Sequence, residues 1–302
     1  MRRLFIKLSL LLSCQLLFVS TAFAAHQHLV IGCTIPCGQF ITARVEHSAA
    51  QRGVSVEFVD LREAADRTDL RTALSSVDAV ISPGGDDVDP RYYMDAVAPE
   101  DRERVAELDA RFGQHTNESR SRDEHEFKLR KMYFGEERFR KLPFLGICYG
   151  MQMLAVSQGL PLVIDIHEVY GIQNRYGVFD HAWLDKDSLA ASVLAAPGAS
   201  GRESHHQAVD VRAYARIQPP STYITGISND GRIPEALEFE SRPLALGVQF
   251  HPEGSSMELS DEVFGWVLDR TRQQSDLEKQ QRRSQLERRR ACERFLTGSS
   301  NL

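Results

Sequence analysis

Residues 143–154 read PFLGICYGMQML, an apolar run, a cysteine between two glycines and a second apolar run. The pattern predicts a strand that turns sharply into a helix, with Cys148 at the turn. Gly146 and Gly150 fit this prediction because only a hydrogen side chain is tolerated beside such a strained turn. The N–H groups at the start of the following helix favour an anion, and therefore the thiolate form of Cys148.

A buried structural cysteine would give the same local pattern, so a base is needed to indicate catalysis. Residues 244–253 read LALGVQFHPE, an apolar strand that Pro252 would end. Because side chains alternate along an extended chain, His251 and Glu253 fall on the same side. Glu253 can then orient the imidazole beside the thiol. The sequence therefore predicts a Cys148–His251–Glu253 catalytic triad with a cysteine nucleophile.

With both pieces in place, the chain resembles the class I glutamine amidotransferase-type cysteine hydrolases, and most closely their γ-glutamyl-γ-aminobutyrate hydrolase branch. The resemblance spans about residues 29–268 and implies a flavodoxin-like, three-layer fold. Four blocks carry it in the family's order: residues 82–90 (SPGGDDVDP), 146–152 (GICYGMQ), 204–209 (SHHQAV) and 247–253 (GVQFHPE).

Strand-like and helix-like segments alternate from residue 29 onward, which predicts an α/β fold. We expect a doubly wound, mostly parallel sheet with helices on both faces. Ligands bind such sheets at the carboxyl ends of the strands, where residues 83–85, Cys148 and His251 each fall. The expected elements are strands at 28–33, 54–59 and 77–81, a helix at 42–51 and a short helix near Leu70.

The segment 82–85 follows the third expected strand, and a plain turn would explain its Pro-Gly pair. The resemblance implies instead that this loop forms an oxyanion hole, with N–H groups from Gly85 and Tyr149 as the donors. Tyr149 stands where the family more commonly has Arg, in a Cys-Arg-Gly sequence. This difference removes a charge beside the pocket, so it bears on substrate preference rather than on the chemistry.

The resemblance also implies substrate contacts from Gln152, His206 and Gln207. Asp86, Asp87 and Asp89 lack the spacing of a calcium loop, and we expect them to be solvated loop carboxylates. Residues 99–140 are highly charged, with the sparse apolar spacing of solvent-exposed helices. Within them, Arg122, Asp123 and Glu126 fit an Arg-Asp-x-x-Glu helix of the resembled branch, for which we expect a structural role.

The N-terminus reads as a secretory signal peptide over residues 1–24, with a basic start, a short apolar run and Ala22-Phe23-Ala24 before Ala25. The sequence therefore predicts a secreted or periplasmic protein, cleaved near Ala24/Ala25, with no stable membrane span once the leader is removed. A retained membrane anchor and a lipoprotein anchored at Cys14 are the alternatives.

Composition fits one large hydrolase domain, which we place at residues 25–269. The chain has 302 residues, 42% of them apolar, and a formal charge of −6 that becomes −9 without the leader. This charge gives no reason to expect a nucleic-acid partner. Residues 270–302 are strongly basic and predict an exposed helix or tail. A homo-oligomer is left open.

Four cysteines remain after the leader is removed. Cys33 and Cys37 are close enough in sequence to pair in an oxidising compartment, but spacing alone does not establish a disulfide. We favour the interpretation that they are two small buried side chains. No C-x-x-C pair or His-rich cluster indicates zinc, so we predict no metal and no organic cofactor.

The resemblance implies that the Cys148 thiolate attacks a γ-glutamyl amide, and that water then releases glutamate from a γ-glutamyl thioester. Three hypotheses remain: an exported γ-glutamyl hydrolase acting alone on a small-molecule substrate, a glutaminase subunit that delivers ammonia to a partner synthetase, and a catalytically idle binding protein. The leader and the intact triad favour the first hypothesis.

Overall fold

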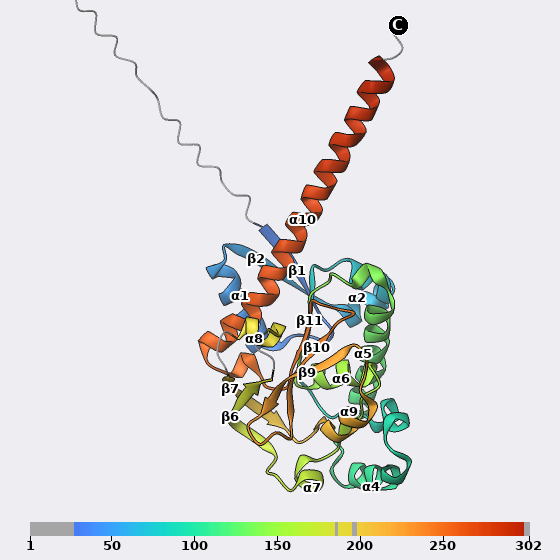
Figure 1. Ribbon diagram of the computed structural model, residues 1–302, viewed down its shortest axis with the longest axis vertical. Coiled ribbons are helices and arrows are strands. Elements are labelled where there is room, and N and C mark those ends of the chain that lie inside the picture. Colours follow the sequence, from blue (N-terminus) through green and yellow to red (C-terminus); the bar gives the residue numbers. More distant parts are fainter. Residues whose placement is uncertain (1–26, 185–186, 195–197, 299–302) are drawn as a thin grey trace, which may run out of the picture.

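The computed structural model describes residues 27–184, 187–194 and 198–298. For residues 278, 279 and 281–298 it describes the backbone but not the side chains. The expected signal peptide and its cleavage site lie outside these residues. A nine-stranded sheet with helices on both faces forms the body of the protein (Figure 1). The predicted α/β fold is therefore confirmed.

The strands are β1 (Gln27–Cys33), β2 (Val54–Asp60), β3 (Ala79–Ser82), β4 (Phe144–Ile147), β5 (Leu162–Val163), β6 (Arg175–Trp183), β7 (Gly198–His205), β8 (Ala208–Val209), β9 (Thr222–Ser228), β10 (Pro234–Phe239) and β11 (Ala245–Val248). The helices are α1 (Gly38–Gln51), α2 (Leu61–Arg67), α3 (Leu70–Ser75), α4 (Arg102–Phe112), α5 (Asn117–Gly135), α6 (Tyr149–Ser157), α7 (Ile166–Tyr170), α8 (Leu189–Val193), α9 (Val211–Ile217) and α10 (Met257–Gly298).

The main sheet has the strand order β2-β1-β3-β4-β11-β10-β9-β6-β7. The first five strands in this order are parallel to one another, and the last four continue the sheet as antiparallel neighbours. The antiparallel extension arises because β9, β10 and β11 follow one another through short turns rather than through crossover helices. The parallel part carries the predicted nucleophile and base.

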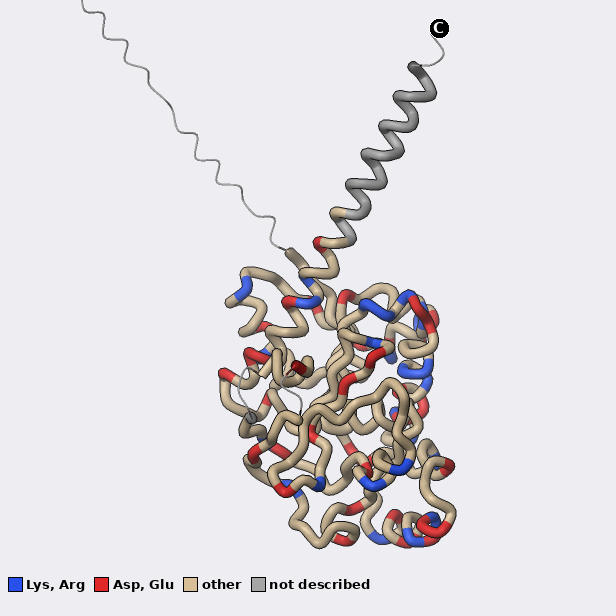
Figure 2. The backbone as a smooth tube through the Cα atoms, viewed as in Figure 1, with Lys and Arg blue, Asp and Glu red and all other residues tan. Residues whose placement is uncertain are grey.

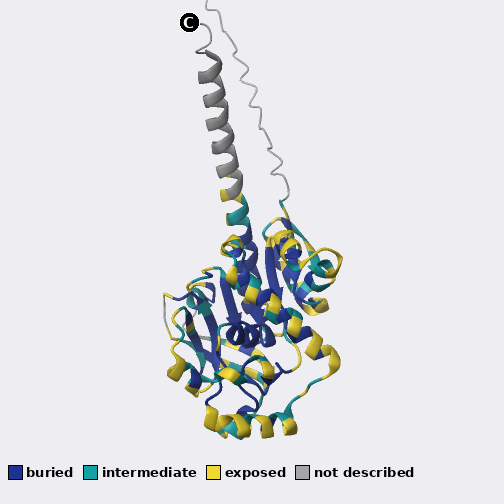
Figure 3. Ribbon diagram, turned by 90° about the vertical axis from the view of Figure 1, so that its right-hand side faces the viewer, coloured by how far each residue is buried: buried dark blue, intermediate teal, exposed yellow. Residues whose placement is uncertain are grey.

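Two apolar cores lie on opposite faces of the sheet, because alternate residues of each central strand point to opposite sides. In β4, for example, Leu145 and Ile147 join one core while Phe144 joins the other. Helices α1, α8 and α10 cover the first core, and α2, α3, α5 and α6 cover the second. Figure 3 shows the buried strands between helices whose outer sides are exposed.

Helix α5 differs from the exposed helix that its charged sequence predicts. Arg122, Asp123, Glu126 and Arg130 are buried. These buried charges are tolerated because they have partners within the fold. Glu126 forms a hydrogen-bonded ion pair with Arg130 and accepts a 2.6 Å hydrogen bond from Thr34 Oγ1. A charged sequence can therefore form a core helix when its buried groups find partners.

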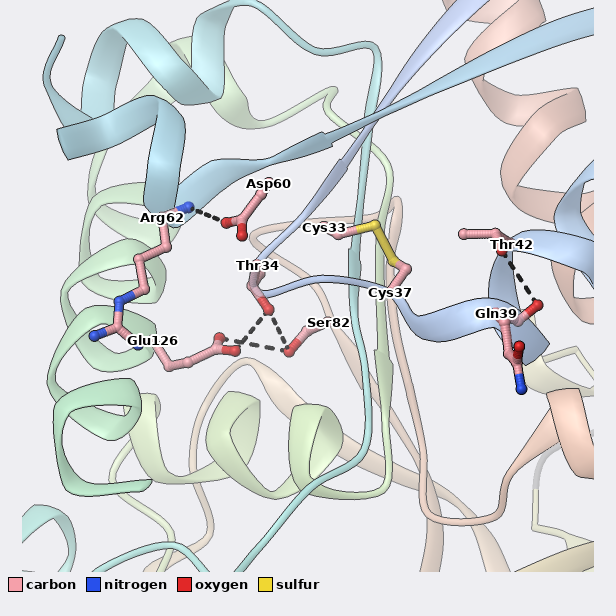
Figure 4. Close-up of a disulfide and its surroundings, with 9 residues drawn as sticks. All are labelled: Cys33, Thr34, Cys37, Gln39, Thr42, Asp60, Arg62, Ser82 and Glu126. Atoms are coloured by element: carbon pink, nitrogen blue, oxygen red, sulfur yellow. Dashed lines mark hydrogen bonds between the residues drawn. A yellow bond between two sulfur atoms is a disulfide. The ribbon is translucent and has the colours of Figure 1, made fainter. Parts of the chain in front are cut away.

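Cys33 and Cys37 form a disulfide, with their Cα atoms 5.5 Å apart, between the end of β1 and the start of α1 (Figure 4). This corrects the favoured expectation of two unpaired cysteines. The pairing was not readable from spacing, because it depends on how sharply the chain turns between β1 and α1. Among the cysteines whose side chains are described, Cys148 is the free one.

Helix α10 runs without interruption from the body of the protein through the expected boundary at residue 270, and its far end projects away from the body (Figure 1). Over the body itself, acidic and basic residues are interspersed (Figure 2). None of the described helices contains a stretch that is long and apolar enough to cross a membrane.

Candidate active site

The neighbouring parallel strands β3, β4 and β11 end at the same edge of the sheet, and the candidate site lies there. Cys148 directly follows β4 and has φ 50° and ψ −105°, a left-handed conformation that costs energy for a residue with a side chain. The predicted glycines are required by packing. A Cβ at Gly150 would lie 2.3 Å from the carbonyl oxygen of Ser82, and one at Gly146 would lie 2.7 Å from the carbonyl carbon of Gly150.

The predicted base and its orienting group are in contact. His251 Nδ1 lies 2.7 Å from Glu253 Oε1, while Nε2 is buried without a hydrogen-bond partner among the described residues. Burial lowers the pKa of His251, but interactions with Cys148 and Glu253 outweigh it and raise that pKa to about 10. The charged form of the imidazole is therefore favoured beside Cys148, where it can donate a proton.

Gln249 is a site residue that our sequence analysis missed. Its side-chain Nε2 lies 3.5 Å from Cys148 Sγ. Gln152 Nε2 donates to Gln249 Oε1 at 3.3 Å and to the backbone carbonyl of Gln207 at 2.9 Å. The sequence did indicate this position, because Gln249 precedes His251 by two residues and the alternation of side chains along a strand places both on one side.

The glycine loop after β3 is packed between the base and helix α5. A Cβ at Gly84 would lie 2.6 Å from His251 Cε1, and one at Gly85 would lie 1.6 Å from Arg122 Nη1. Arg122 Nη2 donates to the carbonyl oxygens of Pro83 and Gly84, at 3.0 and 3.3 Å. Arg122 therefore holds the loop that is expected to supply an oxyanion donor.

Tyr149 is the first residue of α6, so its N–H lies in the helical turn that lacks intrahelical partners. Its side chain is buried, and its hydroxyl donates to Asp123 Oδ1 at 2.6 Å. The guanidinium carbon of Arg122 lies 3.8 Å from the centre of the Tyr149 ring. A positive charge is thus present at this position after all, supplied from α5.

Of the predicted substrate contacts, His206 and Gln207 connect the surrounding loops. His206 Nε2 lies 2.9 Å from Asp87 Oδ1, and Nδ1 lies 3.3 Å from Asp165 Oδ2. Burial lowers the pKa of His206, but the two carboxylates outweigh it and raise that pKa above its usual value. Gln207 Oε1 accepts a 3.0 Å bond from the N–H of Val88. A hydrogen bond from His206 to a substrate would require the release of one carboxylate.

These contacts correct the expectation of solvated loop carboxylates for Asp87 and Asp89, whereas Asp86 is exposed as expected. Asp87 and Asp89 are each only 7% exposed. Asp87 pairs with His206, and Asp89 Oδ2 accepts a 2.7 Å bond from Arg91. The partner of Asp87 lies 119 residues further along the chain, so the local sequence gave no indication of the pairing.

Comparison with known proteins agrees with this geometry. The profile of the family described as Peptidase C26 matches residues 40–253, more than half of the chain. Similar curated proteins include CTP synthases from Pelagibacter ubique, Caulobacter and Parvibaculum lavamentivorans, which are 29%, 32% and 26% identical over 154, 161 and 233 residues. These matches cover 41%, 42% and 66% of this chain, but only 28%, 28% and 36% of the relatives' own lengths.

Two solved structures share the fold at 16% sequence identity. The glutaminase domain of Trypanosoma brucei CTPS with bound acivicin superposes with a TM-score of 0.56, over 82% of this chain and 94% of that domain. A Thermoplasma acidophilum protein described as part of a GMP synthase gives a TM-score of 0.53, over 84% of this chain and 99% of that protein. Both support the α/β fold.

Proposed function

Because the chain belongs to the peptidase C26 family, a class I glutamine amidotransferase-type family, we propose that it is an exported hydrolase that cleaves γ-glutamyl amide bonds. Its general chemistry is that of a hydrolase acting on amide C–N bonds. The observation that carries the proposal is the strained Cys148, whose neighbour His251 is oriented by Glu253 at 2.7 Å.

In the proposed mechanism, the Cys148 thiolate attacks the γ-carbonyl carbon of the substrate and forms a tetrahedral oxyanion. The N–H groups of Tyr149 and Gly85 stabilise that oxyanion. The His251 imidazolium donates its proton to the leaving amine, which yields a γ-glutamyl thioester and neutral imidazole. The imidazole then removes a proton from water, the resulting hydroxide attacks the thioester, and glutamate leaves with the thiolate regenerated.

The polar side chains around Cys148 are consistent in kind with a small γ-glutamyl substrate. Gln249 lies beside the sulfur and Gln152 is hydrogen-bonded to Gln249. His206 joins the loop after β3 to the start of α7. Amide groups and an imidazole suit the carboxylate and amine of a γ-glutamyl group. We propose γ-glutamyl amines and peptides, including γ-glutamyl-γ-aminobutyrate, as substrates.

Export is part of the proposal, and two observations support it. Residues 1–24 have the three parts of a signal peptide, and the Cys33–Cys37 disulfide is of a kind that persists in oxidising compartments. N-terminal sequencing of the protein from the periplasm or culture medium should find Ala25 at or near the first position. A cytosolic protein beginning at Met1 would contradict export.

The alternative is a glutaminase subunit that delivers ammonia to a partner synthetase. The similarity to CTP synthases favours this alternative. The same thioester chemistry would operate in a free-standing hydrolase and in a glutaminase subunit. Kinetics of the mature protein alone separate the two. We expect turnover of γ-glutamyl-γ-aminobutyrate, a γ-glutamyl dipeptide or glutamine without ATP or a partner. Negligible cleavage of all three by a protein whose Cys148 still reacts with iodoacetamide would contradict the free-standing hydrolase.

A further inference from the structure

Three buried side chains meet on one face of the antiparallel part of the sheet. His181 lies on β6, Glu203 on β7 and Glu235 on β10. The register pairs Gly177 with Glu203 and His181 with Ala199, so His181 and Glu203 share a face. Glu235 lies where the pairing of β10 with β9 shifts register, and such an irregularity can redirect a side chain.

The three groups have the spacing of a ligand set. His181 Nε2 lies 2.7 Å from Glu203 Oε1 and 3.6 Å from Glu235 Oε2. One ligand atom from each residue lies within 4.8 Å of the other two. All three residues are at most 2% exposed. The cluster is therefore shielded from water and is not a surface acidic patch.

Glu235 provides a separate indication that the cluster takes a ligand. It is fully buried, and neither of its carboxylate oxygens has a hydrogen-bond partner among the described residues. A buried carboxylate without a hydrogen bond is destabilising and requires an explanation.

We propose that His181, Glu203 and Glu235 bind one divalent transition-metal ion, such as Zn²⁺. One imidazole and two carboxylates are ligands that Zn²⁺ accepts, at bond lengths of about 2.0–2.2 Å. Such bonds separate neighbouring ligand atoms by roughly 3–3.6 Å, so small side-chain shifts would convert the observed spacing into coordination. Water would complete the coordination.

Neighbouring side chains fix the orientation of the proposed ligands, as residues around a metal site commonly do. Glu203 Oε2, the oxygen that does not face His181, lies 3.1 Å from His205 Nε2. The His181 ring stacks on Phe250 with their centres 5.0 Å apart. Gly201 makes this stacking possible, because a Cβ there would lie 2.7 Å from Phe250 and 2.8 Å from His181.

The site would lie close to the nucleophile. The backbone N–H of Gln249 donates to the carbonyl oxygen of Glu235 at 3.0 Å, and the side chain of the same glutamine lies 3.5 Å from Cys148 Sγ. A thiol and an imidazole can also bind Zn²⁺. The test therefore uses the Cys148→Ala chain without a histidine tag, so that the catalytic thiol does not compete.

The measurement is Zn²⁺ stoichiometry and affinity, by calorimetry and by metal analysis after prolonged incubation and dialysis. We expect one equivalent of Zn²⁺ in the Cys148→Ala chain. Adding Glu235→Gln or Glu203→Gln should weaken binding at least about ten-fold, because each removes an anionic ligand. Glu240→Gln, which changes an exposed carboxylate just beyond β10, is the matched control and should leave the affinity unchanged.

Zinc-edge anomalous diffraction from the Cys148→Ala chain provides a second readout that does not depend on whether the glutamine variants fold. A peak between His181, Glu203 and Glu235 is expected. The proposal is overturned if no Zn²⁺ is retained, if the peak lies elsewhere, or if well-folded Glu235→Gln and Glu203→Gln chains bind as tightly as the Glu240→Gln control.

Discussion

Cys148 combines a strained backbone with a buried sulfur beside a charged imidazole, and this combination is what nucleophilic catalysis needs. Replacing Cys148 with Ala should lower kcat at least about a thousand-fold, because no other group can form the thioester. Thermal unfolding should change little, since Ala has nearly the same volume and retains the backbone conformation. Near wild-type turnover by a well-folded variant would remove Cys148 from the mechanism.

Glu253, together with Cys148, raises the pKa of His251, and this dependence gives a pH prediction. Its negative charge helps raise the pKa of His251 to about 10. In the proposed mechanism the imidazolium protonates the leaving amine, so kcat/KM should fall as pH rises through about 10. Glu253→Gln removes the charge, lowers the pKa of His251 and should move this alkaline limb to lower pH.

The control for this pH profile is Glu258→Gln, which changes an exposed carboxylate in the first turn of α10. Its alkaline limb should coincide with that of the wild type. An alkaline limb that stays in place in Glu253→Gln would show that the carboxylate does not set the protonation of His251.

At the scale of elements, the glycine loop after β3 and helix α5 act together. A Cβ at Gly85 would lie 1.6 Å from Arg122 Nη1. Arg122 is buried and bonds the loop carbonyls, so it cannot move aside without releasing them. Gly85→Ala should therefore displace the loop and lower kcat/KM at least about a hundred-fold, as misplaced oxyanion donors do.

Gly135→Ala is the matched control, because a Cβ at that position meets nothing within 4 Å. It should leave kcat/KM unchanged and stabilise the protein by at most about 1 kcal/mol. If Gly85→Ala were as active as Gly135→Ala, the assigned role of the loop would be wrong.

The buried contacts of Tyr149 indicate a role in stability, whereas the sequence suggested a role in substrate preference. A Tyr149→Arg substitution would place a second guanidinium against Arg122 and remove the hydrogen bond to Asp123. We now expect this change to destabilise the protein, rather than mainly to alter which substrate is preferred.

The elements that could be predicted are those whose signal is local. The turn at Cys148 follows from two glycines, and the His251–Glu253 pairing follows from strand alternation. The burial of α5 could not be predicted, because Glu126 finds Thr34 only after β1 and α5 pack together. The cluster of His181, Glu203 and Glu235 brings together three strands distant in sequence, which no residue spacing indicates.

For the molecule as a whole, the Cys33–Cys37 disulfide contributes to stability. A loop this short restricts the unfolded chain by about 2 kcal/mol in the chain-entropy account. Replacing both cysteines with Ala should lower the free energy of unfolding by about this amount, measured by urea denaturation under oxidising conditions.

Reduction of the wild type with dithiothreitol should lower its unfolding free energy to a similar extent, while the double variant should not respond to the reductant. Equal stability of the wild type and the double variant under oxidising conditions would contradict the pairing of Cys33 with Cys37.

The central claim is that Cys148 carries a γ-glutamyl thioester during turnover. The most direct measurement is acid quenching of the protein during reaction with a γ-glutamyl substrate, followed by intact-mass and peptide mass spectrometry, with Cys148→Ala as the control. We predict a mass increase of one γ-glutamyl group, located on the peptide that contains Cys148 and removed by hydroxylamine. A chain that hydrolyses the substrate at the same rate with Cys148 replaced, or that carries the γ-glutamyl group on another residue, would contradict the claim.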